Sequence, residues 1–534
     1  METSTLDQLS PFELKDELIR YAKDFTQSKA ATHKFLNAGR GNPNWIATTP
    51  REAFFLLGRF GIQESKLVWD EPDLGGMPHE MEIAERLAEF VQDHAEDAGA
   101  QMLSKAIDYG VRNLGFDADM FVHELTDAIV GDSYPEPDRM LMHCEATVRR
   151  YLEKVMFDDH PPEGVLDIFA VEGSTAAMCY LFESLFHNRI LRQGDTIALG
   201  TPLFTPYVDL PHYADFKLAT VEVRQGSMAD GRNTWQYTDD QLEKLLDPNV
   251  KAFVLVNPSN PASFAMAPET QKKIVDLVTT KRPDLIIVTD DVYGTFVDGF
   301  RSLAADLPRN TLLVYSYSKY FGCTGWRLGA LGLHEDNIID ERLAALPETD
   351  REALRERYAS LTTGPEKLKF IDRVVADSRD VALDHTAGLS TPQQVQMALF
   401  SLFALVDEED RYQKRCREII HERFQALLRG LEIELPEDPL RVGYYADFDL
   451  EAWGRHVIGA DFADYVMQHP DPIDVVLGLA RDYGTVLLTG SGFNGPAWSV
   501  RVSLANLDAE DYEQIGRDLK EIVSNAVQRW RNAH

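Results

Sequence analysis

The sequence predicts an α/β fold with a mostly parallel, doubly wound sheet. Between about residues 165 and 318, short β-branched runs alternate with helical patterns, as a parallel sheet covered by helices on both faces requires. After Leu333 the pattern changes to charged, amphipathic helices. A length of 534 residues also exceeds one compact core and predicts two or three domains.

The predicted strands are apolar runs that end in turn-forming residues. They cover residues 165–171, 195–200, 218–223, 251–257, 284–290 and 310–318. Between them, residues 173–188 and 267–281 repeat apolar side chains at three- and four-residue steps, which predicts helices. An irregular Gly-, Asn- and Pro-rich loop lies near residues 36–50, and an α+β tail follows a long helix that starts near residue 391.

The composition argues against several kinds of partner. The 53 basic and 87 acidic residues give a net charge of −34, which repels nucleic acid and anionic membranes. Cys144, Cys179, Cys323 and Cys416 lie far apart without a CxxC pair, so neither a disulfide framework nor a zinc site is predicted. The chain lacks a signal-peptide pattern and any run of about 20 apolar residues. We expect a soluble, cytoplasmic protein with no metal.

Ligands of open α/β sheets bind outside the carboxyl ends of the strands, so the residues that follow each strand are informative. Gly173, Ser174 and Thr175 open a helix, a turn suited to phosphate, although taken alone an ordinary capped helix start is the favoured alternative. Phe204 follows the second strand on a proline-framed loop, where simple packing is an alternative. Asn260 lies in an NPSNPAS turn that can aim its amide into a cleft or merely be rigid.

Charged residues follow the last two strands of this series. Asp290 ends one strand in a site that should exclude water, where a carboxylate is costly unless a cation meets it. Lys319 directly follows the next strand, and Arg327 lies eight residues further on. Each residue alone is a weak signal. A Gly-rich turn, an Asp and a Lys, each at its own strand end and in this order, are together a rare coincidence.

Residues 315–329, YSYSKYFGCTGWRLG, carry the most specific motif. They resemble the S-x-S-K-x-x-G-x-x-G-x-R-x-G signature of the aspartate aminotransferase superfamily, the fold-type I enzymes that use pyridoxal 5′-phosphate. The resemblance implies that Lys319 forms the Schiff base with the cofactor. It also implies that Ser316 and Arg327 hold the cofactor phosphate, a task suited to the planar arginine fork.

The same resemblance gives roles to the other strand-end residues. Asp290 would pair with the pyridine nitrogen, and Tyr293 and Asn260 would bind the phenolic oxygen of the ring. Phe204 would stack on the ring. The residues Gly173, Ser174 and Thr175 would hold the phosphate.

Further matches concern the substrate and a second subunit. Arg501, in WSVRVSLAN, matches the arginine that binds the substrate α-carboxylate beside Asn260, and Gly41 matches the glycine that closes over it. Arg40 is a candidate for orienting a distal carboxylate, with a surface arginine as the alternative. Tyr134, in GDSYPEPDRM, resembles the tyrosine that reaches the phosphate of the neighbouring subunit.

The chain is longer than ordinary aminotransferases, and the extra residues fall near 62–130 and 335–388. Three segments, LNAGRGNPNWIATTPREAFFLLGRFG, YPEPDRML and TPQQVQMALFSLF, resemble the aspartate 4-decarboxylases, also called L-aspartate β-decarboxylases. This resemblance implies a large domain with the sheet and a smaller α+β domain from the N- and C-terminal segments. It further implies that residues 1–61 and 389–534 form the small domain, residues 62–334 form the large domain and residues 335–388 form a helical insertion.

The implied reaction is β-decarboxylation of L-aspartate to L-alanine and CO2 through a ketimine, with some aspartate aminotransferase activity. The main alternative is an aminotransferase for aspartate or another amino acid without significant decarboxylation. A non-catalytic regulator and a nicotinamide dehydrogenase agree less well, because Lys319, Asp290 and Arg501 are all present and EGSTAAM lacks the GxGxxG spacing. The family resemblance implies at least a homodimer, and a larger homo-oligomer such as a dodecamer is expected.

Overall fold

The computed structural model describes most of the chain and contains two compact units. The described residues are 11–28, 33–132, 134, 139–227, 233–379, 388–468 and 472–533. One unit, here called the terminal unit, comprises Met1–Trp45, Gly194–Leu285 and Arg415–His534. The other, here called the lysine unit because it contains Lys319, comprises Ile46–Gln193 and Ile286–Lys414.

The strands of the lysine unit have the order β2-β9-β8-β7. They are β2 (Leu166–Val171), β7 (Ile286–Asp290), β8 (Thr311–Ser316) and β9 (Gly329–His334). All residues of β2, β7 and β8 are buried, as their continuous apolar sequences predict. β7 and β8 are parallel, whereas β9 runs antiparallel between β2 and β8. β9 was not predicted because its sequence, GALGLH, has two glycines and a low strand propensity.

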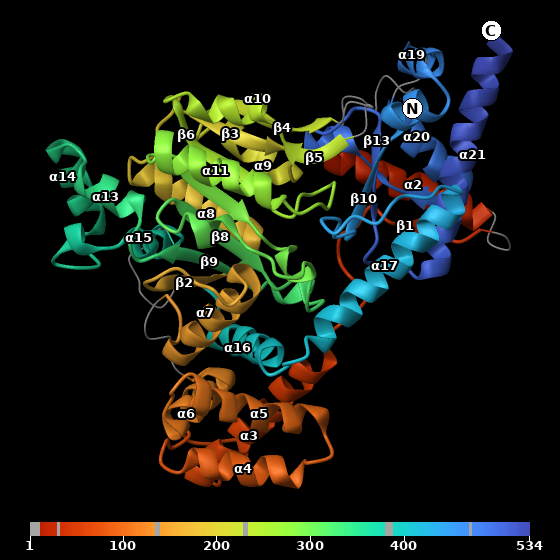
Figure 1. The fold of residues 1–534 in the computed structure, drawn as a ribbon. Helices are drawn as coiled ribbons and strands as arrows, with labels where there is room; N and C mark the ends of the chain where they lie inside the picture. The colour runs from red at the N-terminus through yellow and green to blue at the C-terminus, as the bar shows by residue number, and fades with distance from the viewer. Residues whose placement is uncertain are drawn as a thin grey trace. The chain divides into compact units, whose positions relative to one another are not determined.

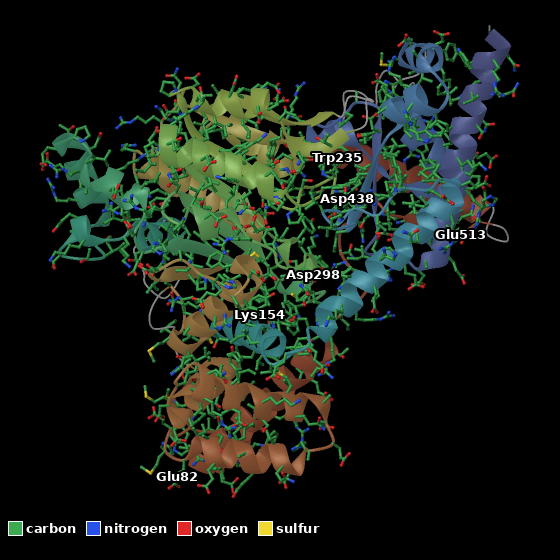
Figure 2. All side chains as sticks on the ribbon, viewed as in Figure 1. Glu82, Lys154, Trp235, Asp298, Asp438 and Glu513 are labelled. Carbon is green, nitrogen blue, oxygen red and sulfur yellow. The ribbon has the colours of Figure 1, made fainter. Side chains whose placement is uncertain are left out.

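Helices form the rest of the lysine unit. They are α3 (Thr48–Val68), α4 (Ile83–Asp93), α5 (Ala98–Asn113), α6 (Ala118–Val130), α7 (Met142–Phe157), α8 (Ser174–His187), α12 (Leu303–Asp306), α13 (Ile338–Ala344), α14 (Glu348–Tyr358), α15 (Phe370–Asp377) and α16 (Thr391–Leu405), with short helical turns η3 (Gly294–Phe296), η4 (Thr324–Trp326) and η5 (Pro365–Lys367). Helices α3 to α6 pack together as a bundle (Figure 1), and Glu82 in Figure 2 precedes α4. α8 packs on β2, β8 and β9.

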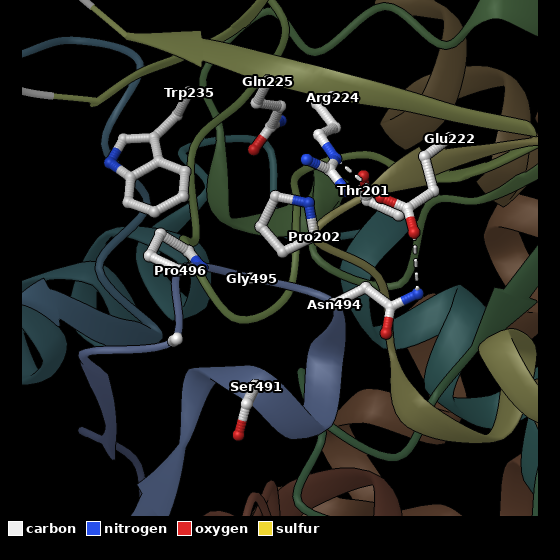
Figure 3. Close-up of a pocket in the computed structure, with 11 residues that line it drawn as sticks. Thr201, Pro202, Glu222, Arg224, Gln225, Trp235, Ser491, Asn494, Gly495 and Pro496 are labelled. Carbon is white, nitrogen blue, oxygen red and sulfur yellow. Dashed lines mark hydrogen bonds and ion pairs between the residues drawn. The ribbon is translucent and has the colours of Figure 1, made fainter. Parts of the chain in front are cut away.

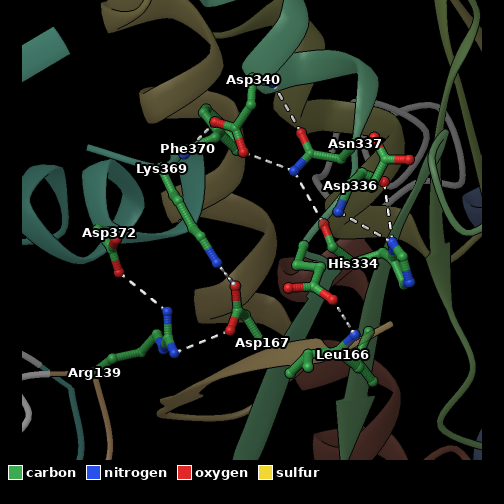
Figure 4. Close-up of polar contacts among 12 residues, drawn as sticks. Arg139, Leu166, Asp167, His334, Asp336, Asn337, Asp340, Lys369, Phe370 and Asp372 are labelled. Atoms are coloured by element: carbon green, nitrogen blue, oxygen red, sulfur yellow. Dashed lines mark hydrogen bonds and ion pairs between the residues drawn. The ribbon is translucent and has the colours of Figure 1, made fainter. Parts of the chain in front are cut away.

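The predicted helical insertion contains α13, α14 and α15, while residues 380–387 of that range lie outside the described residues. Buried and partly buried ion pairs connect it to β2 (Figure 4). Asp167 on β2 accepts from Lys369 at 2.8 Å and from Arg139 at 3.1 Å. Arg139 also donates to Asp372 on α15 at 3.1 Å. These contacts fix the start of α15 against the sheet.

A buried carboxylate holds the other end of α15. Asp377 is 3% exposed and accepts hydrogen bonds from Ser184 at 2.6 Å and from the Tyr358 hydroxyl at 2.9 Å. It also accepts from Arg357 Nε at 2.9 Å and from Asn188 at 3.1 Å. Asp377 therefore joins α8, α14 and α15 through one side chain.

The first part of the terminal unit contains strands in the order β6-β3-β4-β5. They are β3 (Thr196–Thr201), β4 (Ala219–Ser227), β5 (Asn233–Tyr237) and β6 (Val250–Val256), accompanied by α9 (Thr205–Asp209), η1 (Leu210–His212), α10 (Asp239–Leu242), η2 (Glu243–Leu246) and α11 (Pro268–Lys281). β3 is parallel to both β4 and β6, and β5 pairs antiparallel with β4. The short edge strand β5 was not predicted.

The second part of the terminal unit combines both ends of the chain. Its strands form a three-stranded sheet, β10-β13-β12, and a parallel pair, β1-β11. The elements are α2 (Pro11–Ser28), β1 (Leu36–Asn37), α17 (Arg411–Leu431, of which residues 415–431 belong to this unit), β10 (Tyr445–Asp449), α18 (Leu450–Val457), α19 (Ala460–Gln468), α20 (Pro472–Gly478), η7 (Leu479–Tyr483), β11 (Thr485–Val486), β12 (Leu488–Thr489), η8 (Gly490–Phe493), β13 (Ser499–Ser503) and α21 (Ala509–Ala533). One hydrophobic core contains Leu18 and Leu36 from the N-terminal segment with Leu427, Val502 and Leu519 from the C-terminal segment.

The α/β fold class is therefore confirmed, with an α+β part made from the N- and C-terminal segments. All six predicted strands are present, together with both predicted helices. The domain boundaries at residues 61, 334 and 388 remain a prediction. No described helix is long and apolar enough to cross a membrane.

Replacing Asp377 with alanine should destabilise the protein by about 3–5 kcal/mol, because it leaves buried donors and a cation without their acceptor. Thermal unfolding followed by circular dichroism should show a lower melting temperature. Glu348→Ala is the control, because Glu348 is 61% exposed in its ion pairs with Arg351 and Arg355 and surface pairs contribute little. Equal melting temperatures for both variants would contradict this account of α15.

Candidate functional site

Strand register brings several predicted site residues of the lysine unit together. Gly329 at the start of β9 pairs with Val171 at the end of β2 and with Ser316 at the end of β8. The carboxyl ends of β2 and β8 therefore lie on either side of Gly329. On β7, Asp290 pairs with Val314 of β8, so it ends at the same edge of the sheet.

Arg327 lies against the N-terminus of α8. Gly173 precedes Ser174, the first residue of that helix, and has φ = +94°. A Cβ atom on Gly173 would lie 2.3 Å from Arg327 Nη2, so only glycine allows the guanidinium to approach so closely. Arg327 itself has φ = +55° and donates to the carbonyl oxygens of Glu172 and Thr324 at 2.9 and 3.0 Å. A helix N-terminus beside an arginine fork suits a phosphate.

The first part of the lysine motif, residues 315–318, is buried. Ser316 and Ser318 are 3% and 5% exposed, and their hydroxyls are 3.0 Å apart. Lys319 follows in a half-buried position. Ser174 is half-buried, whereas Thr175 and Arg327 are exposed. These residues form a polar cup at the ends of β2 and β8.

Two buried residues follow β7 in the same unit. Asp290 is 4% exposed, and its Oδ1 accepts from the Val292 backbone at 3.2 Å, while Tyr293 is 3% exposed. The neighbouring Asp291 was not singled out from the sequence. Burial raises the pKa of Asp291 to about 7, and a hydrogen bond from Thr289 opposes this shift. An Asp-Asp pair after an apolar strand was the available sequence signal.

These residues fit pyridoxal 5′-phosphate by the chemistry of their donors. The Arg327 guanidinium and the free N–H groups of α8 suit its phosphate. The Lys319 amine can bond to its aldehyde, and the buried Asp290 carboxylate can meet a protonated ring nitrogen. No group of three or more His, Cys, Asp or Glu side chains among the described residues is arranged to hold a metal ion.

Tyr134 also belongs to the lysine unit and is 71% exposed. Residues 133 and 135–138, on either side of it, lie outside the described residues. Its predicted role toward a neighbouring subunit stays a prediction.

The terminal unit contains the other predicted residues, and Arg501 on β13 is their centre. Arg501 is 4% exposed and donates to the Gly39 carbonyl at 2.7 Å and to Asn260 Oδ1 at 3.3 Å. Its guanidinium carbon lies 4.4 Å from the Tyr445 ring centroid and 4.7 Å from that of Phe493. Aromatic walls and neutral acceptors leave the positive charge of Arg501 available to an anion.

Hydrogen bonds from Arg501 and Tyr444 anchor the loop before α3. Gly41 accepts from the Tyr444 hydroxyl at 2.9 Å through its carbonyl oxygen. Arg40 is exposed and has no ion pair or hydrogen-bond partner among the described residues. Phe204 is half-buried before α9, with its ring 5.2 Å from Tyr207 in an edge-to-face arrangement. The structure thus brings Arg501, Asn260 and the Gly39–Gly41 backbone together.

Asp447 is a second residue that the sequence did not reveal. It pairs directly with Arg501 across β10 and β13. Burial raises the pKa of Asp447 to about 7, and the charge of Arg501 opposes this shift. The alternating pattern of YYADFDL places Asp447 on one face of a strand, but only the pairing of β10 with β13 shows that it lies opposite Arg501.

A cavity of about 500 Å³ also lies in the terminal unit, between β3, β4 and the η8 loop (Figure 3). Arg224 and Glu222 form an ion pair of 2.6 Å at its wall, near Trp235 and Asn494. None of the predicted site residues lines this cavity. This cavity is therefore separate from the predicted site residues.

Comparisons with known proteins agree with the geometry. The family model "Aminotransferase class I and II" matches residues 173–519. A bifunctional aspartate aminotransferase and L-aspartate beta-decarboxylase from a Pseudomonas species is 47% identical over 529 residues, which cover 99% of this chain and 98% of that protein. An aspartate aminotransferase from Rhizobium meliloti is 29% identical over 165 residues, 30% of this chain and 38% of that protein.

Solved structures show the same fold at low sequence identity. A double mutant of Thermus thermophilus aspartate aminotransferase has a TM-score of 0.58 and 15% identity, covering 95% of this chain and 96% of that one. Aspartate aminotransferase from Thermotoga maritima has a TM-score of 0.56 and 16% identity, covering 98% and 100%. This chain therefore belongs to the class I and II aminotransferases, a family of pyridoxal 5′-phosphate enzymes with the type I fold.

Proposed function

We propose that this protein converts L-aspartate to L-alanine and CO2 by β-decarboxylation, with aspartate aminotransferase as a side activity. The observation that carries the proposal is the 47% identity to a bifunctional enzyme of that description over 98% of its length. That match includes both stretches that ordinary aminotransferases lack, near residues 62–130 and 335–388. The intact lysine motif and Arg501 support it.

Residues of the lysine unit handle the cofactor and the proton. Bound pyridoxal 5′-phosphate supplies an electron sink for the negative charge that develops on the substrate carbons. The Lys319 amine takes the proton from Cα and returns it there, and after CO2 leaves, a proton that comes ultimately from water is added at Cβ. Asp290 keeps the ring nitrogen protonated, and Tyr293 binds the phenolic oxygen. Gly173, Ser174, Thr175, Ser316 and Arg327 hold the phosphate.

Residues of the terminal unit bind the substrate. Arg501 holds the α-carboxylate, a role supported by its burial and by its donors directed at neutral acceptors. Asn260 binds beside it and also meets the phenolic oxygen, Phe204 stacks on the ring, and Gly41 closes over the α-carboxylate.

The distal carboxylate distinguishes decarboxylation from transamination. A firm ion pair stabilises that carboxylate as an anion and so opposes its conversion to neutral CO2. Arg40 is exposed and unpaired among the described residues, so it can orient the β-carboxylate without enclosing it. We assign this weak contact to Arg40.

The protein is at least a homodimer and is located in the cytoplasm. Enzymes of this family are typically homodimers, and Tyr134 would reach the phosphate site of the neighbouring subunit. A larger homo-oligomer, up to a dodecamer, is supported by a groove on α3 whose lining includes Phe55, Ile62 and Leu67, which are 61%, 54% and 65% exposed. Four cysteines present as free thiols support a cytoplasmic location.

Proton NMR of the holoenzyme with L-aspartate as the only amino acid, and no 2-oxo acid, should show sustained alanine formation with stoichiometric CO2. Lys319→Ala should lower the rate by more than about 10³-fold, because no other group moves the Cα proton. Lys272→Ala, on an exposed face of α11, is the control. If aspartate stays unchanged until 2-oxoglutarate is added, the protein is an aminotransferase without significant decarboxylation.

Arg40→Ala should raise the KM for aspartate roughly tenfold, as expected for the loss of one charged contact. Steady-state alanine formation measures this change. Arg517→Ala, an exposed arginine in the same unit, should leave KM unchanged. Unchanged aspartate turnover in Arg40→Ala would remove Arg40 from the substrate site.

Charges in the α3 groove should prevent the larger assembly. In sedimentation velocity, the double variant Ile62→Glu, Leu67→Glu should therefore be a dimer and not the larger homo-oligomer, because the new charges would lose their hydration when buried in the contact. Met81→Glu is the matched control, since Met81 is 77% exposed but does not line the groove. An unaltered assembly in the double variant would exclude this groove as the contact.

A further inference from the structure

The three-stranded sheet β10-β13-β12 has one apolar face and one polar face. Ala446, Val500 and Val502 on one face belong to the hydrophobic core of the terminal unit. Side chains alternate along a strand, so Asp447 and Arg501, which pair directly across β10 and β13, both lie on the opposite face. A carboxylate and a guanidinium are thus neighbours on one side of the sheet.

Buried polar atoms on this face have no partner among the described residues. They are the Nε atom of Arg501, both carboxyl oxygens of Asp447 and the hydroxyl of Ser503. The two terminal nitrogens of Arg501 donate instead to Gly39 and Asn260. Unpartnered buried polar atoms cost stability, so their presence on one face points to a role in binding.

We infer that Asp447 sets the affinity of Arg501 for the substrate α-carboxylate, and that substrate binds preferentially when Asp447 is protonated. This inference rests on the proposed binding of the α-carboxylate by Arg501. It makes Asp447 a positioning residue that acts through Arg501 and does not touch the reacting carbons. The expected ligand is the carboxylate of an amino acid or of its unreactive dicarboxylic analogue.

The physical reason is that two carboxylates would share one guanidinium. With Asp447 ionised, its charge already offsets the positive charge of Arg501. A second carboxylate bound to Arg501 would then lie near a like charge in a region shielded from water, which disfavours ionisation of the pair. Binding therefore raises the proton affinity of Asp447, and by reciprocity protonation of Asp447 strengthens binding.

The charged surroundings of Asp447 agree with this coupling. Burial raises its pKa to about 7, Asp449 on the same strand adds to the shift, and Arg501 opposes it. The Ser499 hydroxyl on β13 is a neighbour, and it donates to the Pro496 carbonyl at 3.0 Å. The substrate carboxylate is the remaining charge that would enter this group.

The test is calorimetric binding of succinate, aspartate without its amino group, to the holoenzyme. At pH 7.5, in two buffers of different ionisation enthalpy, the wild-type protein should take up about half a proton on binding. Its affinity should fall roughly fivefold or more between pH 6.5 and pH 8.5. Asp447→Asn should reduce both the uptake and the pH dependence and should bind succinate more tightly at pH 8.5.

Asp449→Asn is the matched control. It changes the same residue type on the same strand and face, and asparagine can still accept from the Ala452 backbone, as Asp449 does at 2.9 Å. This variant should keep the proton uptake and the pH dependence, displaced slightly toward lower pH because Asp449 contributes to the raised pKa of Asp447. Equal proton uptake in the wild type and Asp447→Asn would overturn the inference, and so would failure of the wild type to bind succinate at any pH.

Folding and activity give independent readouts. Because burial raises the folded pKa of Asp447 above its ordinary value of 3.8, the stability that it contributes is lost as pH rises toward 7. The melting temperature of Asp447→Asn, relative to wild type, should therefore increase between pH 4 and pH 7 and then stay constant. A constant difference throughout would also overturn the inference. Absence of alanine formation alone would refute the proposed reaction and leave the succinate result valid.

Discussion

The close approach of Gly173 and Gly329 is the constraint on which the polar cup of the lysine unit depends. A Cβ atom on Gly329 would lie 2.6 Å from the Cα atom of Gly173. Because neither residue has a side chain, β2 and β9 can pair up to the point where α8 begins, and Arg327 can lie over that turn. The N-terminus of α8, Arg327 and Ser316 are all positioned by this backbone contact.

The small sheet of the terminal unit separates apolar from polar side chains by simple alternation. Val500 and Val502 face the hydrophobic core, while Arg501 between them faces the other way. One strand therefore holds the arginine rigidly, because its neighbours are fully packed. The same alternation places Asp447 on the face of Arg501, and the pairing of β10 with β13 makes the two residues direct neighbours.

Most of the fold follows from sequence periodicity, and the exceptions have physical reasons. Continuous apolar runs predict β2, β7 and β8 because these strands are buried on both faces. β9 was missed because strand propensity disfavours glycine, whereas Gly329 is needed for the close approach to Gly173. At the site, the motif around Lys319 and the acid Asp290 are local signals. Asp447 is not local, because its partner lies 54 residues away and only the pairing of strands brings them together.

The hydrophobic core that joins Leu18 to Leu519 has a consequence for biosynthesis. The ribosome adds on the order of 5–20 residues per second, so roughly 25–100 s separate the emergence of these two ends. Helix α2 packs mainly on η7, and also on β11 and α20, so it lacks these partners for most of that time. A nascent chain of this protein therefore carries the apolar side of α2 uncovered until the C-terminal segment of the core has been made, a period in which exposed apolar surface favours aggregation.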